Sequence, residues 1–296
     1  MDQTIFLIKV RTAAGRRAAR LLIESIRAFG GELSGCSIWL FEADPQGTPC
    51  QELENATVRI VPLDLPEYLL HYDFGDKVYA CACAEQLAPA GVSSLVWIDL
   101  SCLVVNPPVL YNLGRTLDAA VRPVHIRNIG LLATDPLDAY WKRIYESVGV
   151  VDIETTLESF VDRQSIRAYF NTHAFAINPA KGLLRRWLEC FEELARDPAF
   201  QAGACRDELH QIFLHQAVLS ALIAASLNPD RVRILPPEYN YPYNLHQSLT
   251  PERRAEAFND LVSFTYEDRT LNPASMGDIE IREPLRSWLA SYDEKK

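Results

Sequence analysis

The stretch Val96-Trp97-Ile98-Asp99-Leu100-Ser101-Cys102-Leu103-Val104-Val105-Asn106-Pro107-Pro108 decides the fold class. Its first residues continue an apolar run over 95–98, which is typical of a strand that is covered on both faces in the middle of a parallel sheet. Asp99 follows this strand at once. In open α/β sheets ligands bind beyond the carboxyl ends of the strands, so we expect Asp99 to face a crevice. The alternative is that Asp99 is a turn residue or caps a neighbour.

Outward from this stretch, apolar strands alternate with amphipathic helices. Such alternation predicts an α/β fold with a mostly parallel central sheet and helices on both faces. Strands are expected at residues 4–10, 37–41, 57–61, 94–98, 103–105, 119–121, 173–177, 232–235 and 261–266. Helices are expected at 14–29, 76–88, 136–147, 178–196, 208–225 and 284–292, with a short one starting at 250. We expect a single domain over residues 1–296, with a core at about 4–266 and a C-terminal extension at 267–296.

The charge balance disfavours a wide nucleic-acid surface. The 296 residues include 39 acids and 29 bases, giving a net charge of −10, whereas phosphate backbones need clustered cations. A local cationic pocket for a small phosphorylated ligand is still compatible with this balance. The seven cysteines form no C-x-x-C pair, and we interpret them as reduced thiols. Without an apolar run of about 18 residues or a basic leader, the sequence predicts a cytoplasmic protein that does not insert into a membrane.

Polar residues gather where the first, second and fourth predicted strands end. They are Lys9, Arg11 and Thr12, then Glu42 and Asp44, then Asp99 and Ser101. Lysine and arginine neutralise diphosphates, so these positions suit a nucleotide ligand. A solvated surface charge is the alternative interpretation for each basic residue. The Tyr- and Asn-rich segment 236–246 suits either sugar contacts or an ordered surface loop packed by its own side chains.

Several motifs together resemble the nucleotide-sugar glycosyltransferases of the A-type fold, in particular the glycogenin-like and bacterial galactosyltransferase-like group. Trp97-Ile-Asp99-Leu-Ser101 resembles the strand that ends in D-x-D in that family. Phe170-Asn171-Thr172-His173-Ala174-Phe175 resembles its F-N-[ST]-G-V-F strand, and His215-Gln216 its D-Q pair. Asp76-Lys77 resembles its lysine-bearing helix, and Pro236 with Tyr239-Asn240 its L-P…Y-N segment.

The sequence departs from the family pattern at four positions. Ser101 replaces the second acid of D-x-D, His173 replaces a glycine, His215 replaces the acid of D-Q, and Thr265 replaces a metal-binding histidine. Mg²⁺ and Mn²⁺ prefer oxygen ligands, many of them carboxylates. With this degenerate D-x-D motif, Asp99 is the main candidate metal ligand, and we expect a weak Mn²⁺ or Mg²⁺ site or none.

The resemblance implies a glycosyltransferase, of the hexosyltransferase type, that moves a sugar from a nucleotide-sugar donor to an unknown acceptor. It implies a catalytic group of Asp99, His215 and Gln216, and a donor-binding group of Lys9, Arg11, Thr12, Asp44, Lys77, Ser101, Asn171 and His173. From their apolar surroundings alone, His173 and His215 are equally compatible with histidines of the core. The alternatives to an enzyme are a non-catalytic nucleotide-sugar-binding protein and a structural or partner-binding protein that retains the fold.

Overall fold

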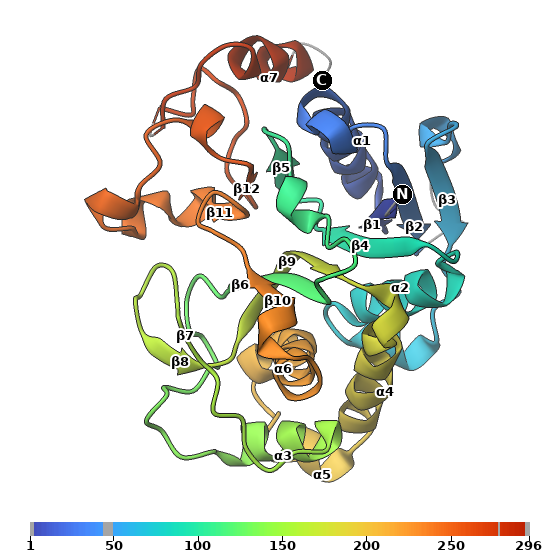
Figure 1. Ribbon diagram of the computed structural model, residues 1–296, viewed down its shortest axis with the longest axis vertical. Coiled ribbons are helices and arrows are strands. Elements are labelled where there is room, and N and C mark those ends of the chain that lie inside the picture. The colour runs from blue at the N-terminus through green and yellow to red at the C-terminus, as the bar shows by residue number, and fades with distance from the viewer. Residues whose placement is uncertain (1–2, 44–49, 278, 294–296) are drawn as a thin grey trace.

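The computed structural model describes residues 3–43, 50–277 and 279–293 (Figure 1). Within these residues the main sheet has seven strands in the order β10-β6-β9-β4-β1-β2-β3. They are β1 (Gln3–Val10), β2 (Ser37–Glu42), β3 (Val58–Pro62), β4 (Val92–Ile98), β6 (Ala119–Pro123), β9 (Phe170–Ile177) and β10 (Val232–Ile234). Only β9 runs antiparallel to its neighbours β4 and β6. The predicted, mostly parallel sheet is therefore confirmed.

Helices cover both faces of this sheet (Figure 1). Helix α1 (Ala13–Phe29) packs on one face, where residues such as Leu22 and Ile26 join a core with Phe6 and Ile98. The opposite face carries four helices, α2 (Gly75–Leu87), α3 (Ala139–Val148), α4 (Leu183–Ala195) and α6 (Glu208–Ser226). The short helix α5 (Pro198–Ala202) links α4 to α6. Strand β4 is buried at every position, as its apolar run predicts for a central strand.

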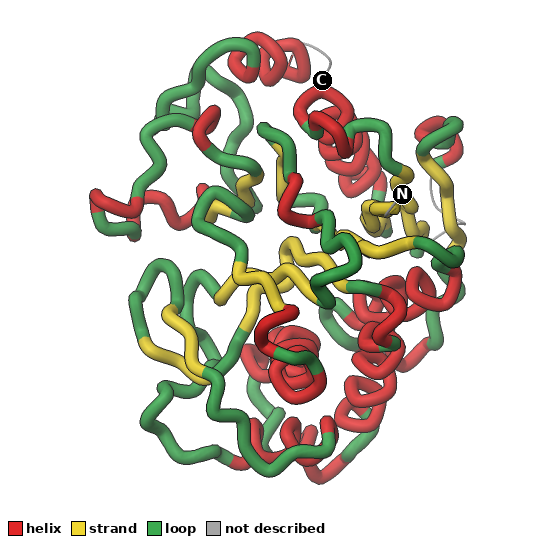
Figure 2. Tube along the Cα trace, viewed as in Figure 1, coloured by secondary structure: helices red, strands yellow, loops and turns green. Residues whose placement is uncertain are grey.

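A second, smaller sheet connects the centre of the molecule to its C-terminal part. It contains β5 (Cys102–Val104), β12 (Ser263–Thr265) and β11 (Tyr241–Pro242). Much of the chain after β10 is loop and short helical turn, as Figure 2 shows, and it ends in α7 (Leu285–Asp293). This part has its own apolar core, in which Phe264 and Leu289 pack with Leu103. The extension is therefore packed onto the residues that follow Asp99.

Several elements differ from the sequence-based prediction, among them a long helix and a hairpin. The helix expected over 178–196 is split, because Gly182 adopts φ 66° after a short 3₁₀ turn and α4 begins only at Leu183. A hairpin of β7 (Thr156–Glu158) and β8 (Ser165–Arg167) was not expected. Strands of three residues give too short a pattern for alternation to be recognised.

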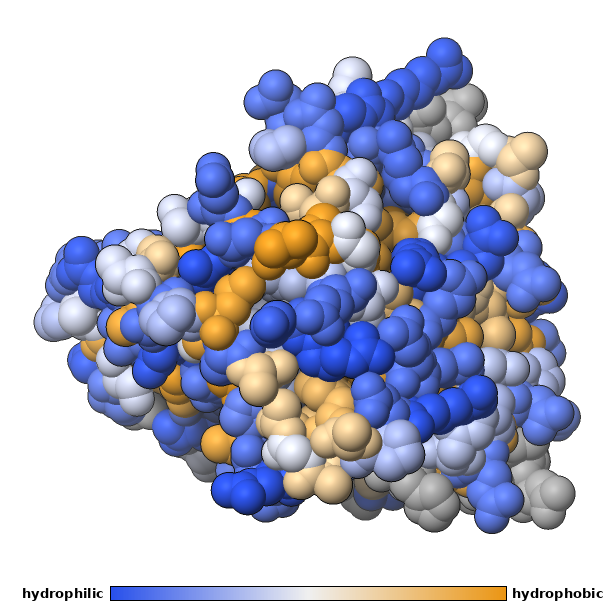
Figure 3. All heavy atoms as spheres, turned by 90° about the horizontal axis from the view of Figure 1, so that it is seen from below, coloured by the Kyte–Doolittle hydropathy of each residue, from blue (hydrophilic) through white to orange (hydrophobic). Residues whose placement is uncertain are grey.

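Helix α6 is, within the described residues, the one helix that is long and apolar enough to cross a membrane by length and composition. In the fold it lies against β9 and the other helices, and 56% of its apolar window is buried. The surface seen from below in Figure 3 is mainly hydrophilic and is crossed by a short apolar strip. We interpret the composition of α6 as that of a core helix.

Candidate active site

Asp99 directly follows β4, and an ion pair occupies its carboxylate. The Lys77 ammonium, on α2, donates to Asp99 Oδ2 at 2.7 Å and to the Thr172 carbonyl oxygen at 3.2 Å. The Trp97 indole N–H donates to Asp99 Oδ1 at 2.8 Å. The Lys77 side chain is 2% exposed and that of Asp99 is 16% exposed. The pair is therefore almost closed off from solvent on the lysine side and reaches solvent on the carboxylate side.

A second ion pair lies beside the first. Lys9, near the end of β1, donates to Asp76 Oδ2 at 2.6 Å, and Asp76 precedes Lys77 on α2. The lysine-bearing helix thus meets the ends of both β1 and β4, which the sequence had predicted to lie together. Arg11 is exposed just after β1. Thr12 has a structural contact, since its hydroxyl oxygen accepts from Gly15 N–H and caps α1.

For two of the predicted donor-binding residues, Asp44 and Ser101, the structure gives no side-chain contact to discuss. Asp44 lies outside the described residues. Ser101 is partly buried, and its carbonyl oxygen accepts a hydrogen bond from the Tyr266 N–H at 2.8 Å. The structure shows this backbone contact of Ser101 with the C-terminal part, next to the short sheet of β5 and β12.

Strand β9 brings Asn171 and His173 to the same end of the sheet. The Asp99 N–H donates to the His173 carbonyl oxygen at 2.7 Å, which fixes the two residues side by side. Asn171 Oδ1 accepts from the His173 backbone N–H at 2.8 Å, and His173 Nδ1 lies 3.1 Å from it. Asn240 Nδ2 donates to the same oxygen at 2.8 Å. Because Oδ1 is an acceptor, Nδ1 carries a proton and Nε2 is the nitrogen that points away from Asn171.

Glu267, which the sequence analysis missed, faces that second nitrogen. Its Oε1 lies 3.5 Å from His173 Nε2, and this contact lowers the pKa of the Glu267 carboxyl below its usual range. The backbone of Glu267 has φ 48°, a conformation that side-chain-bearing residues rarely adopt and that is frequent at functional sites. No motif marks this position, because it depends on a turn after β12.

His215 and Gln216 are buried on α6 and contact Thr172. His215 Nδ1 lies 2.8 Å from the Ile212 carbonyl oxygen, and Nε2 lies 3.0 Å from the Thr172 hydroxyl. Burial, with the Lys77 ammonium as a further cause, holds the pKa of His215 well below its usual range. The ring is therefore neutral and donates through Nδ1. Its Nε2 is an acceptor that shares the one proton of the Thr172 hydroxyl with Gln216 Oε1, 3.1 Å from that hydroxyl. Gln216 Oε1 accepts from the Thr172 backbone N–H at 3.2 Å.

Phe74 covers the buried histidine from the side of the site. Its ring stacks on His215 with centroids 4.5 Å apart, and the Lys77 nitrogen lies 4.8 Å from its centroid. Phe74 adopts φ 61° and is 38% exposed, which is high for a large apolar residue. The sequence analysis did not identify Phe74 as a residue of the site.

A divalent metal ion does not fit these side chains well. Both oxygens of Asp99 already accept hydrogen bonds, from Lys77 and Trp97. Thr265 stands where the resembled family has a metal-binding histidine, and its hydroxyl donates to Asn240 Oδ1. Over residues 3–43, 50–277 and 279–293, no group of three or more His, Cys, Asp or Glu side chains is arranged to hold a metal ion.

Comparison with protein-family models gives a match over most of the chain. A family model described as the Rhodobacterales glycosyltransferase domain matches residues 11–226. The chain belongs to this glycosyltransferase family. The match to the Rhodobacterales glycosyltransferase domain includes Lys77, Asp99, His173 and His215, and it ends before Glu267. No curated protein matches the chain.

Solved glycosyltransferase structures share the fold of this family member. The galactosyltransferase LgtC, in complex with donor and acceptor sugar analogs, matches with a TM-score of 0.54 and 11% identity, over 98% of this chain and 94% of LgtC. The bifunctional glycosyltransferase WbbM matches with a TM-score of 0.54 and 12% identity, over 98% of this chain and 52% of WbbM, so the chain spans about half of that protein. The A-type glycosyltransferase fold expected from the sequence is confirmed.

Proposed function

We propose that the protein transfers a sugar, of the hexose class, from a nucleotide-sugar donor, with weak or no dependence on a divalent metal. The donor diphosphate would bind at the ends of β1 and β4, and the acceptor is not specified by any feature of the chain. The observation that carries this proposal is the Lys77 ammonium held on the Asp99 carboxylate at 2.7 Å. This ion pair lies at the edge of the sheet where ligands of open α/β folds bind, with the carboxylate on the solvent side and the ammonium buried behind it, and it supports the proposal if an incoming diphosphate takes the place of the carboxylate on Lys77.

The charge argument begins with the leaving group. When the bond between sugar and diphosphate breaks, negative charge develops on the diphosphate, and a preorganised cation stabilises it. Lys77 is such a cation, because α2, Asp99 and the Thr172 carbonyl hold its ammonium in place. The exposed Arg11 supplies further positive charge at the end of β1, where Lys9 is paired with Asp76. A metal ion on Asp99 would compete with Lys77 for the carboxylate, which supports weak metal dependence.

His173 and Glu267 suit contacts to the sugar or the acceptor. His173 is 28% exposed through its side chain and Glu267 is 44% exposed, so both reach solvent beside Asp99. The lowered pKa of Glu267 makes it a weak base, and we assign it the role of orienting His173. His215 and Gln216 have no such exposure, and we assign them a positioning role through Thr172.

The test is a panel of uridine, guanosine, thymidine and cytidine diphosphate sugars, each measured with Mn²⁺, with Mg²⁺ and with chelator. Release of the nucleoside diphosphate reports turnover, and the melting temperature reports binding. A ligand at about a hundred times its Kd stabilises the fold by about 2.7 kcal/mol. Lys77→Ala should remove much of that shift, whereas Lys142→Ala, which changes an exposed lysine on α3, should not.

The outcomes separate the proposal from its alternatives. Turnover without added metal supports the transferase. A melting shift without turnover of any sugar supports the non-catalytic binding protein. No shift with any of the four bases, with or without metal, would favour the structural or partner-binding protein. The cytoplasmic location and the absence of nucleic-acid partners stay predictions from composition and charge.

A further inference from the structure

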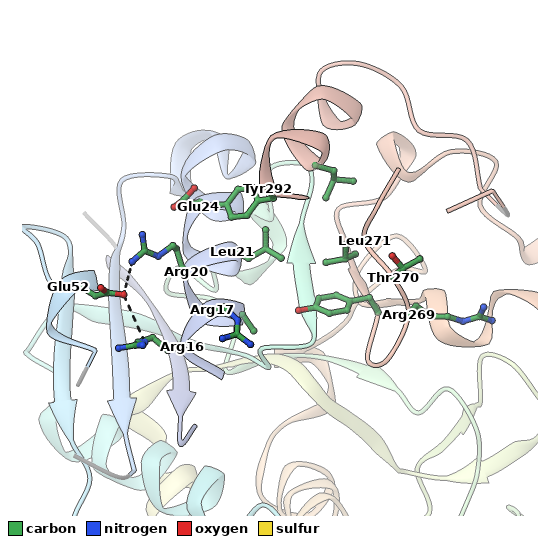
Figure 4. Close-up of a pocket in the computed structure, with 13 residues that line it drawn as sticks. Arg16, Arg17, Arg20, Leu21, Glu24, Glu52, Arg269, Thr270, Leu271 and Tyr292 are labelled. Carbon is green, nitrogen blue, oxygen red and sulfur yellow. Dashed lines mark hydrogen bonds and ion pairs between the residues drawn. The ribbon is translucent and has the colours of Figure 1, made fainter. Parts of the chain in front are cut away.

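A groove lies between α1 and the C-terminal extension (Figure 4). We call it the α1–α7 groove and define it by Arg16, Arg17, Arg20, Leu21, Arg269 and Leu271. Its volume is about 570 Å³. Pockets that bury organic ligands fall at about 300–1,000 Å³, so the groove has room for far more than an inorganic ion.

The lining of the groove is cationic in a protein whose net charge is −10. Four arginines and two glutamates line it. Arg16 and Arg20 share one carboxylate, with Glu52 Oε1 at 4.0 Å and 2.7 Å, and both point toward it in Figure 4. Across the described part of the chain, Arg17 has no carboxylate within 4.0 Å, and Arg269 extends away from α1 in Figure 4, with its guanidinium 5.8 Å from the Tyr243 ring centroid. The arginines therefore exceed the acids, and the groove favours an anion.

The remaining lining is apolar or aromatic. Leu21 lies one helical turn beyond Arg17 on α1, facing Leu271 and Tyr292 across the groove (Figure 4). Leu289 of α7 also lines it. A ligand that fills this space would carry an anionic group for the arginines and an apolar group for the leucines. Arginine guanidinium groups match phosphate oxygens in bidentate geometry, which makes phosphate the favoured anion.

We propose that the α1–α7 groove binds an organic phosphate with an apolar group, at a site separate from the donor site. The lining includes none of Lys9, Lys77 and Asp99. The groove nevertheless touches the loop after Asp99 through Tyr266. The Tyr266 hydroxyl donates to the Leu100 carbonyl oxygen at 2.9 Å. The Tyr266 backbone N–H donates to the Ser101 carbonyl oxygen at 2.8 Å. A bound phosphate ligand would therefore lie against a residue that holds this loop.

The experiment titrates the full chain with three probes by calorimetry: octyl phosphate, inorganic phosphate and octyl glucoside. Octyl phosphate carries both groups, and each of the others lacks one. Arg17→Gln should weaken octyl phosphate binding about tenfold, which is about 1.4 kcal/mol, and Arg269→Gln should weaken it less, because the Arg269 guanidinium lies toward Tyr243. Arg206→Gln is the matched control, because Arg206 is exposed before α6 and does not line the groove. Melting temperatures of all three variants check that they fold.

The proposal predicts that octyl phosphate binds at least tenfold more tightly than inorganic phosphate, and that octyl glucoside binds weakest. Equal binding of octyl phosphate and inorganic phosphate would overturn it, as would equal binding by the wild type and both groove variants, or no binding. A flotation assay with phosphatidylcholine vesicles containing phosphatidic acid then identifies the source. Flotation with the vesicles that is lost in Arg17→Gln indicates that the ligand is a lipid phosphate. If the protein binds octyl phosphate but does not float with the vesicles, the ligand is a soluble organic phosphate. Neither result depends on sugar transfer, so failure here leaves the proposed function standing.

Discussion

The backbone N–H of Asp99 donates to the carbonyl oxygen of His173 at 2.7 Å, just past the last pair of the β4–β9 ladder, Ile98 and Ala174. The one antiparallel strand of the main sheet thus delivers a histidine beside the carboxylate that ends a central strand. Lys77 meets the same carboxylate from α2. Strand β9, distant in sequence from α2 and β4, converges with them here, and the first predictions concern what each element contributes.

Replacing Lys77 by methionine should destabilise the fold by about 3 kcal/mol, because it leaves the partly buried Asp99 carboxylate without its cation. The measurement is the free energy of unfolding in urea. Asp99→Asn should also destabilise, whereas the double variant should lose clearly less than the sum of the two. Lys142→Met is the matched control on a surface helix. Strict additivity of the two changes would contradict an energetic coupling between Lys77 and Asp99.

Chelator should leave donor binding nearly unchanged. The oxygens of Asp99 already accept hydrogen bonds from Lys77 and Trp97, so a metal ion gains few ligands there. Affinity for the best nucleotide sugar is measured with Mn²⁺ and with excess chelator. A loss of a hundredfold or more, about 2.7 kcal/mol, would mean that other oxygens complete a metal site.

Stability should fall as the pH drops below about 6.5, the ordinary pKa of histidine. Burial holds the pKa of both His125 and His215 well below that value; Arg122 and His173 also act on His125, and Lys77 on His215. Below about pH 6.5 the unfolded chain binds protons that the folded chain does not, so unfolding becomes easier. Each histidine contributes at most about 1.4 kcal/mol per pH unit.

The check is urea unfolding of the wild type and His215→Gln at about pH 7.5 and about pH 5.5, on either side of the histidine range. Glutamine keeps a donor and an acceptor but does not titrate in this range. The variant should therefore show a smaller loss of stability on acidification. An identical loss in both proteins would show that His215 is not one of the groups responsible.

Arg122→Met should loosen the Tyr-rich segment 236–246. Arg122 is 2% exposed, and its guanidinium donates to the carbonyl oxygens of Pro237 at 2.9 Å, Asn240 at 3.1 Å and Tyr239. Methionine leaves these carbonyls without their donor, at a cost of about 3 kcal/mol. Amide hydrogen exchange should speed up in this segment. Arg206→Met should leave the exchange unchanged, and unchanged exchange in Arg122→Met would contradict the role of Arg122.

The central sheet could be predicted from the sequence because strands such as β4 end in an apolar run and are buried at every position. The strand-end argument predicted where Asp99 lies, whereas the approach of Lys77 and His173 to it was implied only by the family resemblance. His215 could not be interpreted in the same way. Its apolar neighbours are equally compatible with a substrate-facing residue and a core residue, and its partner Thr172 lies 43 positions earlier. Glu267 depends on the path of a late loop, which no periodicity describes.

The contact between Trp97 and Asp99 has an optical consequence. The indole N–H donates to the carboxylate at 2.8 Å, and the Lys77 nitrogen lies 5.4 Å from the ring centroid. The emission of an indole responds to charges at this range. A ligand that displaces Lys77 from Asp99, or adds negative charge beside it, should therefore shift the fluorescence of Trp97. The fluorescence of Trp97 is therefore expected to report ligand binding at the end of β4.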